Sequence, residues 1–540
     1  METDYVVIGS GINSLVAAAE LARSGAEVVL LEEHERLGGF IDSGELTVPG
    51  FIHDTFSSWH PLFVSGGAYA ELGQELHARG LRYRNTEDAN TPWVCASIGT
   101  DARGNTTAVY AQRDPGATAA AFEHAEDREA YARMLEDFGK QAPVIFGVLG
   151  SEMNLPNAAK LGFKAVRLGM NRAQQLVRQG LMSGRNLTRS TFTGTEADQL
   201  WAPWLLHAGL GPEQASGGVM LPVMAASMHQ FGLPVVQGGA AQFVAAFESL
   251  LTDHGVVIRK NTRAQGVVVA SGRAAAVRTA TETFTARRGI LASVSVPQLY
   301  NELLEPAAVP EETRAEARAH RPGRAAMQVH VALSGPVPWS DGRLARTPLI
   351  HISTGSDSTA IACAQAEAGL LPANPTIVVG QQCVLDPSRA PEGQTTLWLQ
   401  LQELPFKPIG DAAGELDTSA GWDEQLTAEF MQRVLGAIEQ YAPGLGVLVL
   451  GIKAFNPQQL SRANRNAVSG DPYGGAAELH QNLLWRPLPR LGKGRSPVKG
   501  LWHIGAATHP GPGLGGGSGH LVAQQLIRSA KRSKWRRSDM

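Results

Sequence analysis

The sequence predicts an α/β fold in which a Rossmann-type nucleotide-binding domain stands beside a discontinuous α+β domain. The first sixty residues show a strand, a glycine turn, a helix and a second strand that ends in an acid. Residues 500–520 show a further strand and a turn rich in glycine and proline. Between these ends, residues 63–229 are mainly helical in pattern, whereas residues 298–454 contain strand-like apolar runs.

The composition excludes several classes of protein. A chain of 540 residues with 43% hydrophobic residues and a formal net charge of −3 is typical of a globular protein and not of a disordered or nucleic-acid-binding one. Cys95, Cys363 and Cys383 are scattered and have no disulfide or metal-ligand spacing, so we expect a reducing cytoplasm and no metal. The first residues enter a strand pattern at once, and no apolar run reaches the roughly 18 residues of a spanning helix. We therefore expect neither a signal peptide nor a membrane span.

The first element is a nucleotide-binding motif. Residues 4–8 predict a strand, the turn Gly9-Ser10-Gly11-Ile12-Asn13-Ser14 follows, and residues 15–22 have helical spacing. Residues 27–31 predict the second strand, which ends at Glu32. Strand, glycine turn, helix, strand and an acid about 20 residues after the turn together indicate dinucleotide binding.

Each residue type in this motif has a physical reason. Gly9 allows a tight turn, and Gly11 lets the backbone approach a pyrophosphate at the helix N-terminus. Ser14 replaces the third glycine, a position that mainly sets how closely helix and sheet pack. Glu32 is placed to accept from a ribose diol and would repel a 2′-phosphate, which favours FAD or NAD over NADP. We assign to the cofactor Gly9, Gly11, Ile12, Asn13, Ser14 and Glu32.

Residues 7–39 carry a family resemblance. VIGSGINSL and LEEHERLGG are similar to the N-terminus of phytoene-dehydrogenase-related flavoproteins, a branch of the FAD-dependent amine-oxidase-like superfamily. The resemblance implies that Gly38 and Gly39 approach the pyrophosphate and ribityl chain of FAD. It also implies that Ser58 reaches the isoalloxazine ring. Many members have Arg after the glycine pair, where this chain has Phe40, which puts a guanidinium contact in doubt.

Two later stretches resemble the same family. Residues 237–269 match a segment whose backbone, here near Ala264, lies against the adenine ring. Residues 288–294 match a strand that runs back under the cofactor. Residues 500–506 predict a last strand, and the turn THPGPGLGGGSG follows. Gly511, Gly513 and Gly516 fit G-x-G-x-x-G, but too little chain follows them for a second βαβ unit.

The resemblance places the last turn against the flavin. A helix N-terminus carries free N–H groups and partial positive charge, which would stabilise a reduced ring. Glycine is expected there because a side chain would collide with the isoalloxazine. The cofactor contacts assigned to this turn are Gly505, Ala506, His509, Gly515 and Gly516.

The resemblance implies that three segments build one FAD-binding domain. These segments are residues 1–62, 230–297 and 455–530, and the substrate-binding domain takes residues 63–229 and 298–454. Residues 531–540 form a basic C-terminal tail.

His509 and His60 are the candidate catalytic residues. His509 lies in the flavin turn and His60 follows the Ser57-Ser58 pair, so both are expected to face the cavity. The alternative is that each histidine bonds backbone and orders its loop. Tyr473, His480 and Arg486 are further candidates; an Arg before a Pro is more often structural, pairing with an acid or a carbonyl.

Residues 153–195 contain seven Lys or Arg and no Asp or Glu, interleaved with apolar residues. Such a stretch fits either a peripheral membrane contact, to which the basic tail would add, or a solvated face over the substrate cavity.

The leading hypothesis is an FAD-dependent oxidoreductase that dehydrogenates or oxidises a hydrophobic, carotenoid- or terpenoid-like substrate. Hydride transfer to flavin N5 would be followed by reoxidation by oxygen, a quinone or another acceptor. An FAD-dependent amine oxidase is the second hypothesis. The third is a non-catalytic ligand binder on a scaffold like that of GDP-dissociation inhibitors.

Overall fold

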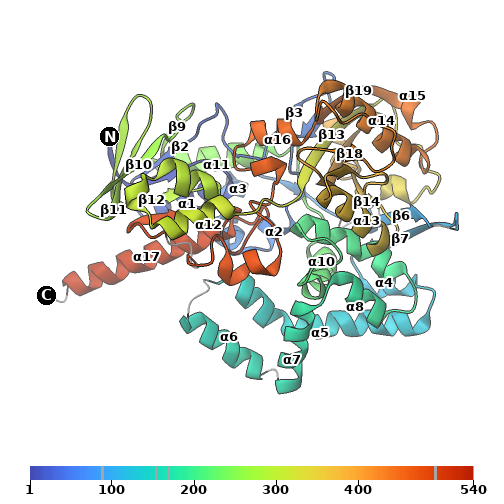
Figure 1. The fold of residues 1–540 in the computed structure, drawn as a ribbon, viewed down its shortest axis with the longest axis horizontal. Helices are drawn as coiled ribbons and strands as arrows, with labels where there is room; N and C mark the ends of the chain where they lie inside the picture. Colours follow the sequence, from blue (N-terminus) through green and yellow to red (C-terminus); the bar gives the residue numbers. More distant parts are fainter. Residues whose placement is uncertain (87–90, 102, 152–154, 168, 492–495, 539–540) are drawn as a thin grey trace.

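The computed structural model describes residues 1–86, 91–101, 103–151, 155–167, 169–491 and 496–538. Two sheets lie side by side along the long axis, and a group of helices lies below the second sheet (Figure 1). The α/β fold class is confirmed. The domain boundaries given above stay a prediction.

The first sheet has the order β10–β11–β12–β1–β2–β9, and β20 pairs with the end of β12. The pairs β12–β1, β1–β2, β2–β9 and β12–β20 are parallel, whereas β10, β11 and the start of β12 form an antiparallel meander. Its strands are β1 (Glu2–Ile8), β2 (Val28–Leu31), β9 (Val257–Arg259), β10 (Gly266–Ala270), β11 (Arg273–Arg278), β12 (Thr283–Ala292) and β20 (Leu501–His503).

Alternation along β1 explains why this sheet is covered on both faces. Tyr5 and Val7 pack into one apolar cluster, whereas Val6 and Ile8 pack into the opposite one. Successive side chains of a strand point to opposite faces, so an all-apolar run such as this one needs cover on both. The first cluster is closed by α1 (Ile12–Arg23), α3 (Gly67–Ala78), α11 (Ala241–Asp253) and α17 (Gly517–Ser538). The second is closed by the meander and α12 (Glu311–Ala319).

The second sheet has the order β19–β13–β17–β16–β14–β6–β7. Leu397, Leu399 and Leu401 of β17 face a core under α14, whereas Trp398 faces the other side. The strands and their adjoining helices are β6 (Trp93–Thr100), β7 (Thr106–Gln112), β13 (Ala325–Leu333), β14 (Leu349–Ile352), β16 (Ile377–Gly380), β17 (Thr395–Leu404), β19 (Val449–Phe455), α13 (Ser356–Glu367), α14 (Glu424–Glu439), α15 (Leu445–Leu448) and α16 (Pro457–Ala463).

A helical layer packs on the Trp398 side of the second sheet. None of the helices among the described residues is long and apolar enough to cross a membrane. The layer consists of α4 (Pro115–Ala120), α5 (Ala125–Leu149), α6 (Leu155–Arg167), α7 (Met170–Leu181), α8 (Gly184–Thr191), α9 (Glu196–Trp201) and α10 (Gly217–Phe231).

Short elements link these layers. They are α2 (Pro61–Val64) and the strand pairs β3 (Ser43–Glu45) with β4 (Ile52–Asp54), β5 (Tyr83–Arg84) with β8 (Val235–Val236), and β15 (Leu370–Leu371) with β18 (Gly410–Asp411).

The structure gives the form of the two basic stretches. Residues 531–538 continue α17, and residues 539–540 lie outside the described part. The basic stretch 153–195 forms α6, α7, α8 and the approach to α9; residues 153, 154 and 168 lie outside the described part.

Candidate cofactor site

The first glycine turn leaves open space in front of α1. Gly9 has a φ of +84°, and a Cβ there would lie 3.0 Å from the Ser293 carbonyl oxygen. Gly11 is the N-cap of α1, and a Cβ added to it would meet no protein atom within 4 Å. The absence of a side chain at Gly11 is therefore not explained by packing within the described residues. A diphosphate at the N-terminus of α1 fits this space.

The glycine pair after β2 closes one side of this turn. The Gly38 N–H donates to the Ser10 carbonyl oxygen at 3.1 Å, and Gly38 bridges Gly11. Gly39 has a φ of +64°, and a Cβ there would lie 3.2 Å from the Gly11 Cα. Both glycines thus lie beside Gly11, and their expected contact with FAD stays a prediction.

Glu32 is buried at the end of β2 and is held from two sides. Its Oε2 accepts from the Ser10 N–H at 2.9 Å and from the Ser10 hydroxyl at 2.6 Å, and its Oε1 accepts from the His34 N–H at 2.9 Å. A carboxylate has about four acceptor positions, so one remains for a ribose hydroxyl. The stretch leading to buried Ala264 runs beside it, because the Thr262 N–H donates to the Glu32 carbonyl oxygen at 2.7 Å.

The C-terminal turn lies directly on the first one. Asn13 Oδ1 accepts from the Ser518 N–H at 3.1 Å, from the Ser518 hydroxyl at 2.9 Å and from the Gly519 N–H at 3.2 Å. The Gly505 N–H in turn donates to the Ser518 hydroxyl at 2.8 Å. The side-chain oxygen of Asn13 therefore binds the start of α17, a contact that the cofactor assignment did not foresee. The same bonds occupy two N–H groups of α17 that were expected to be free.

Ser293, at the end of β12, touches both turns. It lies under Gly9, and its hydroxyl would be 2.9 Å from a Cβ on Gly505, which has a φ of +107°. The sequence assigned Ser293 only to the strand that was expected to run back under the cofactor. Its position shows that the middle segment contacts both glycine turns.

The remaining glycines of the last turn pack against the first segment. A Cβ on Gly516 would lie 2.7 Å from Val16, with Ile12 behind it, and a Cβ on Gly515 would lie 3.2 Å from the Leu62 carbonyl oxygen. Ser14 is fully buried, which agrees with its expected packing position. Close packing against Val16 thus requires a glycine at position 516, independently of any contact with a flavin ring.

Arg486 binds the backbone that follows the last strand. It is buried and donates to the Ala506 carbonyl oxygen, with Nη2 at 2.8 Å, and to the Tyr473 carbonyl oxygen at 2.6 Å. Burial lowers the pKa of Arg486 to about 10. The structural interpretation of Arg486, a partner of carbonyl groups, is confirmed.

His60 is held by protein contacts and is not exposed to a surface. Its Nδ1 lies 2.9 Å from the Tyr83 hydroxyl, and its ring packs edge-to-face on Phe243. Burial lowers the pKa of His60 to about 3, so the ring is neutral at pH 7.

His509 points to the end of the long helix α5. Its Nε2 donates to the Ser151 carbonyl oxygen at 3.1 Å, and burial lowers its pKa. Its Nδ1, like Nε2 of His60, is buried without a hydrogen-bond partner among the described residues. The ring of His509 therefore has the backbone contact that was the alternative to catalysis, whereas the ring of His60 is held by the side chain of Tyr83. Each ring keeps one nitrogen without a partner among the described residues.

Ser58 belongs to a buried ion cluster that sequence reasoning missed. Its hydroxyl donates to Asp54, and Arg389 Nη1 binds the same carboxylate at 2.7 Å. Arg389 Nε also binds Asp386 at 3.1 Å, and Gln382 donates to Ser58 at 3.0 Å. The cluster ties the first segment to residues 382–389, some 330 positions later. No local pattern connects residues so distant, so no sequence signal indicated it.

Phe40 follows the glycine pair and packs against other aromatic rings. Its ring meets Phe56 at 5.1 Å between centroids, and Phe56 meets Phe455 at 5.1 Å. The three rings form an apolar joint between the first segment and β19. This position therefore supplies packing and no positive charge.

An apolar cluster extends from Trp59 into the helical layer. Trp59, Trp204, Met220 and Met224 belong to one cluster with Ala477, which lies in the segment before the last strand. The indole N–H groups of Trp59 and Trp204 are buried and have no partner within the described part of the chain. The surroundings of Ser58 are thus aromatic and uncharged on this side.

The fold and the glycine turns define a nucleotide-binding α/β protein with a second sheet-containing domain. The model of the family of flavin-containing amine oxidoreductases matches residues 15–526. The chain therefore belongs to this family, and the protein is a flavin-dependent oxidoreductase. The FAD cofactor predicted from the sequence agrees with this membership.

Relatives agree with this assignment along nearly the whole chain. A rat protein, the pyridine nucleotide-disulfide oxidoreductase domain-containing protein 2 of Rattus norvegicus, is 26% identical over 98% of this chain and 94% of its own. The lycopene-forming phytoene desaturase of Pseudescherichia vulneris is 23% identical over 95% of this chain and 96% of its own. Among solved structures, cyclohexylamine oxidase from Brevibacterium oxydans has a TM-score of 0.59 at 15% identity, covering 98% of this chain and all of that chain.

Proposed function

We propose that this flavin-dependent oxidoreductase dehydrogenates or oxidises a hydrophobic, carotenoid- or terpenoid-like substrate. The observation that carries the proposal is the apolar cluster that begins at Trp59, next to Ser58, and continues through Trp204 and the methionines of α10. These aromatic and thioether side chains pack against one another and would give a neighbouring substrate path an uncharged wall, which suits an elongated hydrocarbon. The similarity to a phytoene desaturase along 95% of the chain supports the same substrate class.

In this proposal the open space before Gly11 takes the diphosphate of FAD, and Glu32 with the backbone near Ala264 takes the adenosine. Gly38 and Gly39 border the path toward the ring. Residues 505–506 and 515–516 border the ring itself. Asn13 has a supporting role, because its bonds to Ser518 hold the two turns together.

Bound FAD would supply the redox chemistry as a hydride acceptor at N5, with oxygen, a quinone or another acceptor as the final oxidant. The side chains orient the substrate and exclude water. His60 is neutral at pH 7, because burial lowers its pKa to about 3, and burial also lowers the pKa of His509. Neither ring adds a positive charge to the apolar side of the site.

Oxidation of an amine is the second candidate. The family is named for amine oxidoreductases, and the fold is shared with a cyclohexylamine oxidase. An identity of 15% supports the fold alone, so the choice between a C–H and a C–N bond rests on experiment.

The test is anaerobic reduction of the purified, FAD-loaded protein. Phytoene in detergent micelles is expected to bleach the visible flavin band in a single turnover and to yield a product with additional double bonds. Putrescine and cyclohexylamine are mixed with the same preparation in parallel.

Rapid bleaching by an amine, with none by phytoene or other polyenes, would replace the first candidate by the second. A variant that narrows the apolar cluster, Met224→Trp, should slow reduction by the polyene while FAD stays bound. If no compound of either class reduces the flavin, both candidate substrate classes are wrong.

A further inference from the structure

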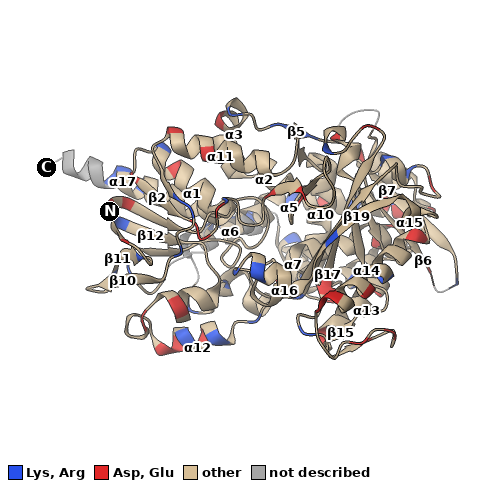
Figure 2. Cartoon of the chain, turned by 90° about the horizontal axis from the view of Figure 1, so that it is seen from above, with Lys and Arg blue, Asp and Glu red and all other residues tan. Residues whose placement is uncertain are grey.

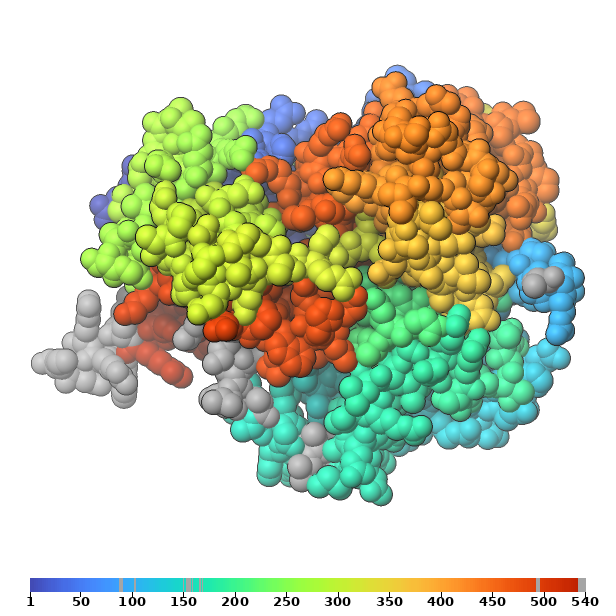
Figure 3. Space-filling view, viewed as in Figure 1, coloured from blue at the N-terminus to red at the C-terminus, as the bar shows by residue number. Residues whose placement is uncertain are grey.

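The helices α6 and α7 form an arm that projects from the lower edge of the molecule (Figures 1 and 3). Phe163 of α6 is 63% exposed, and Met170 and Leu181 of α7 are 61% and 69% exposed. No described residue of α7 is buried. Large apolar side chains exposed together on neighbouring helices indicate a contact surface.

The apolar side chains of α7 share one face. Met170, Val177 and Leu181 follow each other at spacings of seven and four residues, which places them on one side of a helix. Leu161 of α6 instead packs toward Gly147 of α5 and holds the arm to the body. The exposed stripe is therefore separate from the contacts that fix the arm.

The arm is also strongly basic. From α6 to α8 the chain has no Asp or Glu, whereas acidic and basic residues alternate along helices such as α12 (Figure 2). Within the part of the chain that the structure describes, no carboxylate pairs with Lys160, Lys164 or Arg178. These charges are free to attract an anionic surface.

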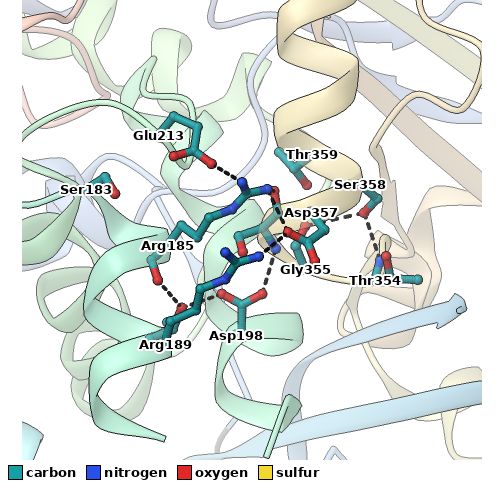
Figure 4. Close-up of polar contacts among 12 residues, drawn as sticks. Ser183, Arg185, Arg189, Asp198, Glu213, Thr354, Gly355, Asp357, Ser358 and Thr359 are labelled. Atoms are coloured by element: carbon teal, nitrogen blue, oxygen red, sulfur yellow. Dashed lines mark hydrogen bonds and ion pairs between the residues drawn. The ribbon is translucent and has the colours of Figure 1, made fainter.

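Two of the basic residues have another role. Arg185 of α8 binds Asp357 of α13 at 2.7 Å and also pairs with Glu213, and Arg189 reaches the same Asp357 at 2.8 Å (Figure 4). These ion pairs tie α8 to the second sheet domain. Before the arm begins, the Ser151 carbonyl oxygen, next to the end of α5, is bound by His509. The end of α5 therefore lies beside the C-terminal glycine turn.

An open hollow of about 560 Å³ lies where α7 meets α8. It combines cationic, polar and apolar groups, which suits a phosphate-bearing head group with the start of an acyl chain. Its lining residues are Arg178, Leu181, Met182, Asn186, Arg189 and Ser190.

We propose that α6, α7 and the hollow beside Arg178 dock the protein on an anionic phospholipid bilayer. A basic helix with an exposed apolar stripe lies in the plane of a membrane surface, and each basic residue near that surface adds about 1 kcal/mol of attraction. Docking of a second copy of this chain in a symmetric dimer would bring two basic faces together, and their like charges would repel each other. A nucleic acid would leave the apolar stripe without a partner.

The test is co-sedimentation of the full-length, FAD-loaded protein with vesicles. We expect binding to vesicles of phosphatidylcholine mixed with phosphatidylserine, weak binding to phosphatidylcholine alone, and release by high salt. The charge variant Lys160→Glu/Lys164→Glu/Arg178→Glu should reduce binding by at least about tenfold. The apolar variant Phe163→Ser/Val177→Ser/Leu181→Ser should also reduce binding to the same vesicles, although its net charge equals that of the wild type.

The matched control is Arg103→Glu/Lys407→Glu/Lys453→Glu, which changes the net charge equally at exposed positions outside the arm. It should bind like the wild type. Equal binding by all variants, no preference for the anionic vesicles, or an increase in oligomer size without vesicles would overturn the proposal. Flavin content and flavin reduction in detergent are measured on the same samples, so that a failure of the proposed substrate is distinguished from a failure of docking.

Discussion

Asn13 and Ser518 are 505 positions apart, yet the side-chain oxygen of Asn13 accepts hydrogen bonds from both the backbone N–H and the hydroxyl of Ser518. Asn13 lies in the first turn of α1, and Ser518 lies in the first turn of α17. One buried amide therefore joins the two ends of the chain at the candidate cofactor site.

Replacing Asn13 by Leu should separate these two turns. The donors of Ser518 and Gly519 would lose their buried acceptor, at a cost of about 2–4 kcal/mol in the free energy of unfolding. Asn13→Asp keeps an acceptor in place and should lose less. Chemical denaturation of the FAD-free protein measures the difference. If Asn13→Leu were as stable as the wild type, the hydrogen bonds between Asn13 and Ser518 would not be needed for stability.

Gly11 is expected to be required for ligand binding, whereas Gly38 is expected to be required for the fold. At Gly11 a Cβ meets no protein atom within 4 Å, so Gly11→Ala should leave the stability of the FAD-free protein unchanged or higher by about 0.5 kcal/mol. It should nevertheless weaken FAD binding by at least about tenfold, because the methyl group enters the diphosphate space.

Gly38→Ala is the contrasting variant. Gly38 has a φ of +109°, and its Cβ would lie 2.4 Å from the Ile41 carbonyl oxygen, so the FAD-free protein should lose about 1–3 kcal/mol. Thermal unfolding and FAD fluorescence quenching measure the two effects separately. Normal FAD affinity of Gly11→Ala would place the diphosphate elsewhere.

Glu32 and Glu33 are neighbours with different expected roles. Glu32→Gln should raise the dissociation constant of FAD about tenfold, because a charged acceptor is lost and an amide N–H₂ faces the donors of Ser10. Glu33→Gln is the control, since Glu33 is partly exposed and pairs with Arg263 at 3.8 Å. An equal loss of affinity in both variants would contradict a specific ribose contact by Glu32.

The stability of the protein should fall as the pH falls below about 6.5. Burial lowers the pKa of His60 to about 3, of His330 to about 3 and of His207 to about 4, from an ordinary 6.5. The unfolded chain then binds protons before the folded one, so each histidine's contribution is complete above pH 6.5. It is lost by about 1.4 kcal/mol per pH unit down to the folded pKa.

Glu403 acts in the opposite direction, because burial raises its pKa from 4.5 to about 7. Between these two pH values its contribution to the slope of stability with pH cancels that of about one histidine. Urea unfolding between pH 5 and pH 7.5 should therefore show a positive slope of stability with pH, and His60→Gln should reduce it. The exposed residue His480, changed to Gln, serves as the control. A slope that His60→Gln leaves unchanged would show that His60 is already protonated in the folded protein.

The sequence indicated the first turn because its signals are local. Gly9, Gly11 and Glu32 lie within one βαβ unit, whose spacing is fixed by strand and helix geometry, and the structure places all three around the open space before α1. A structural role of Arg486 was also indicated, since an Arg before a Pro is more often structural and pairs with an acid or a carbonyl, and the structure shows carbonyl partners.

The contacts of the other candidate side chains could not be predicted from the sequence. His60, His509 and Ser58 were expected at the ring, and the structure adds partners for them from Tyr83, Ser151 and Arg389. These partners come from separate elements, and periodicity carries no information about which distant elements meet.

The sequence by itself determined the class of fold, the nucleotide motif and the basic character of residues 153–195, because each of these depends on residues a few positions apart. Tertiary structure alone decided that Asn13 meets Ser518, that Ser293 contacts both glycine turns, and that the stripe on α7 stays exposed. Contacts between distant segments depend on how whole layers pack, and packing is a property of the assembled chain.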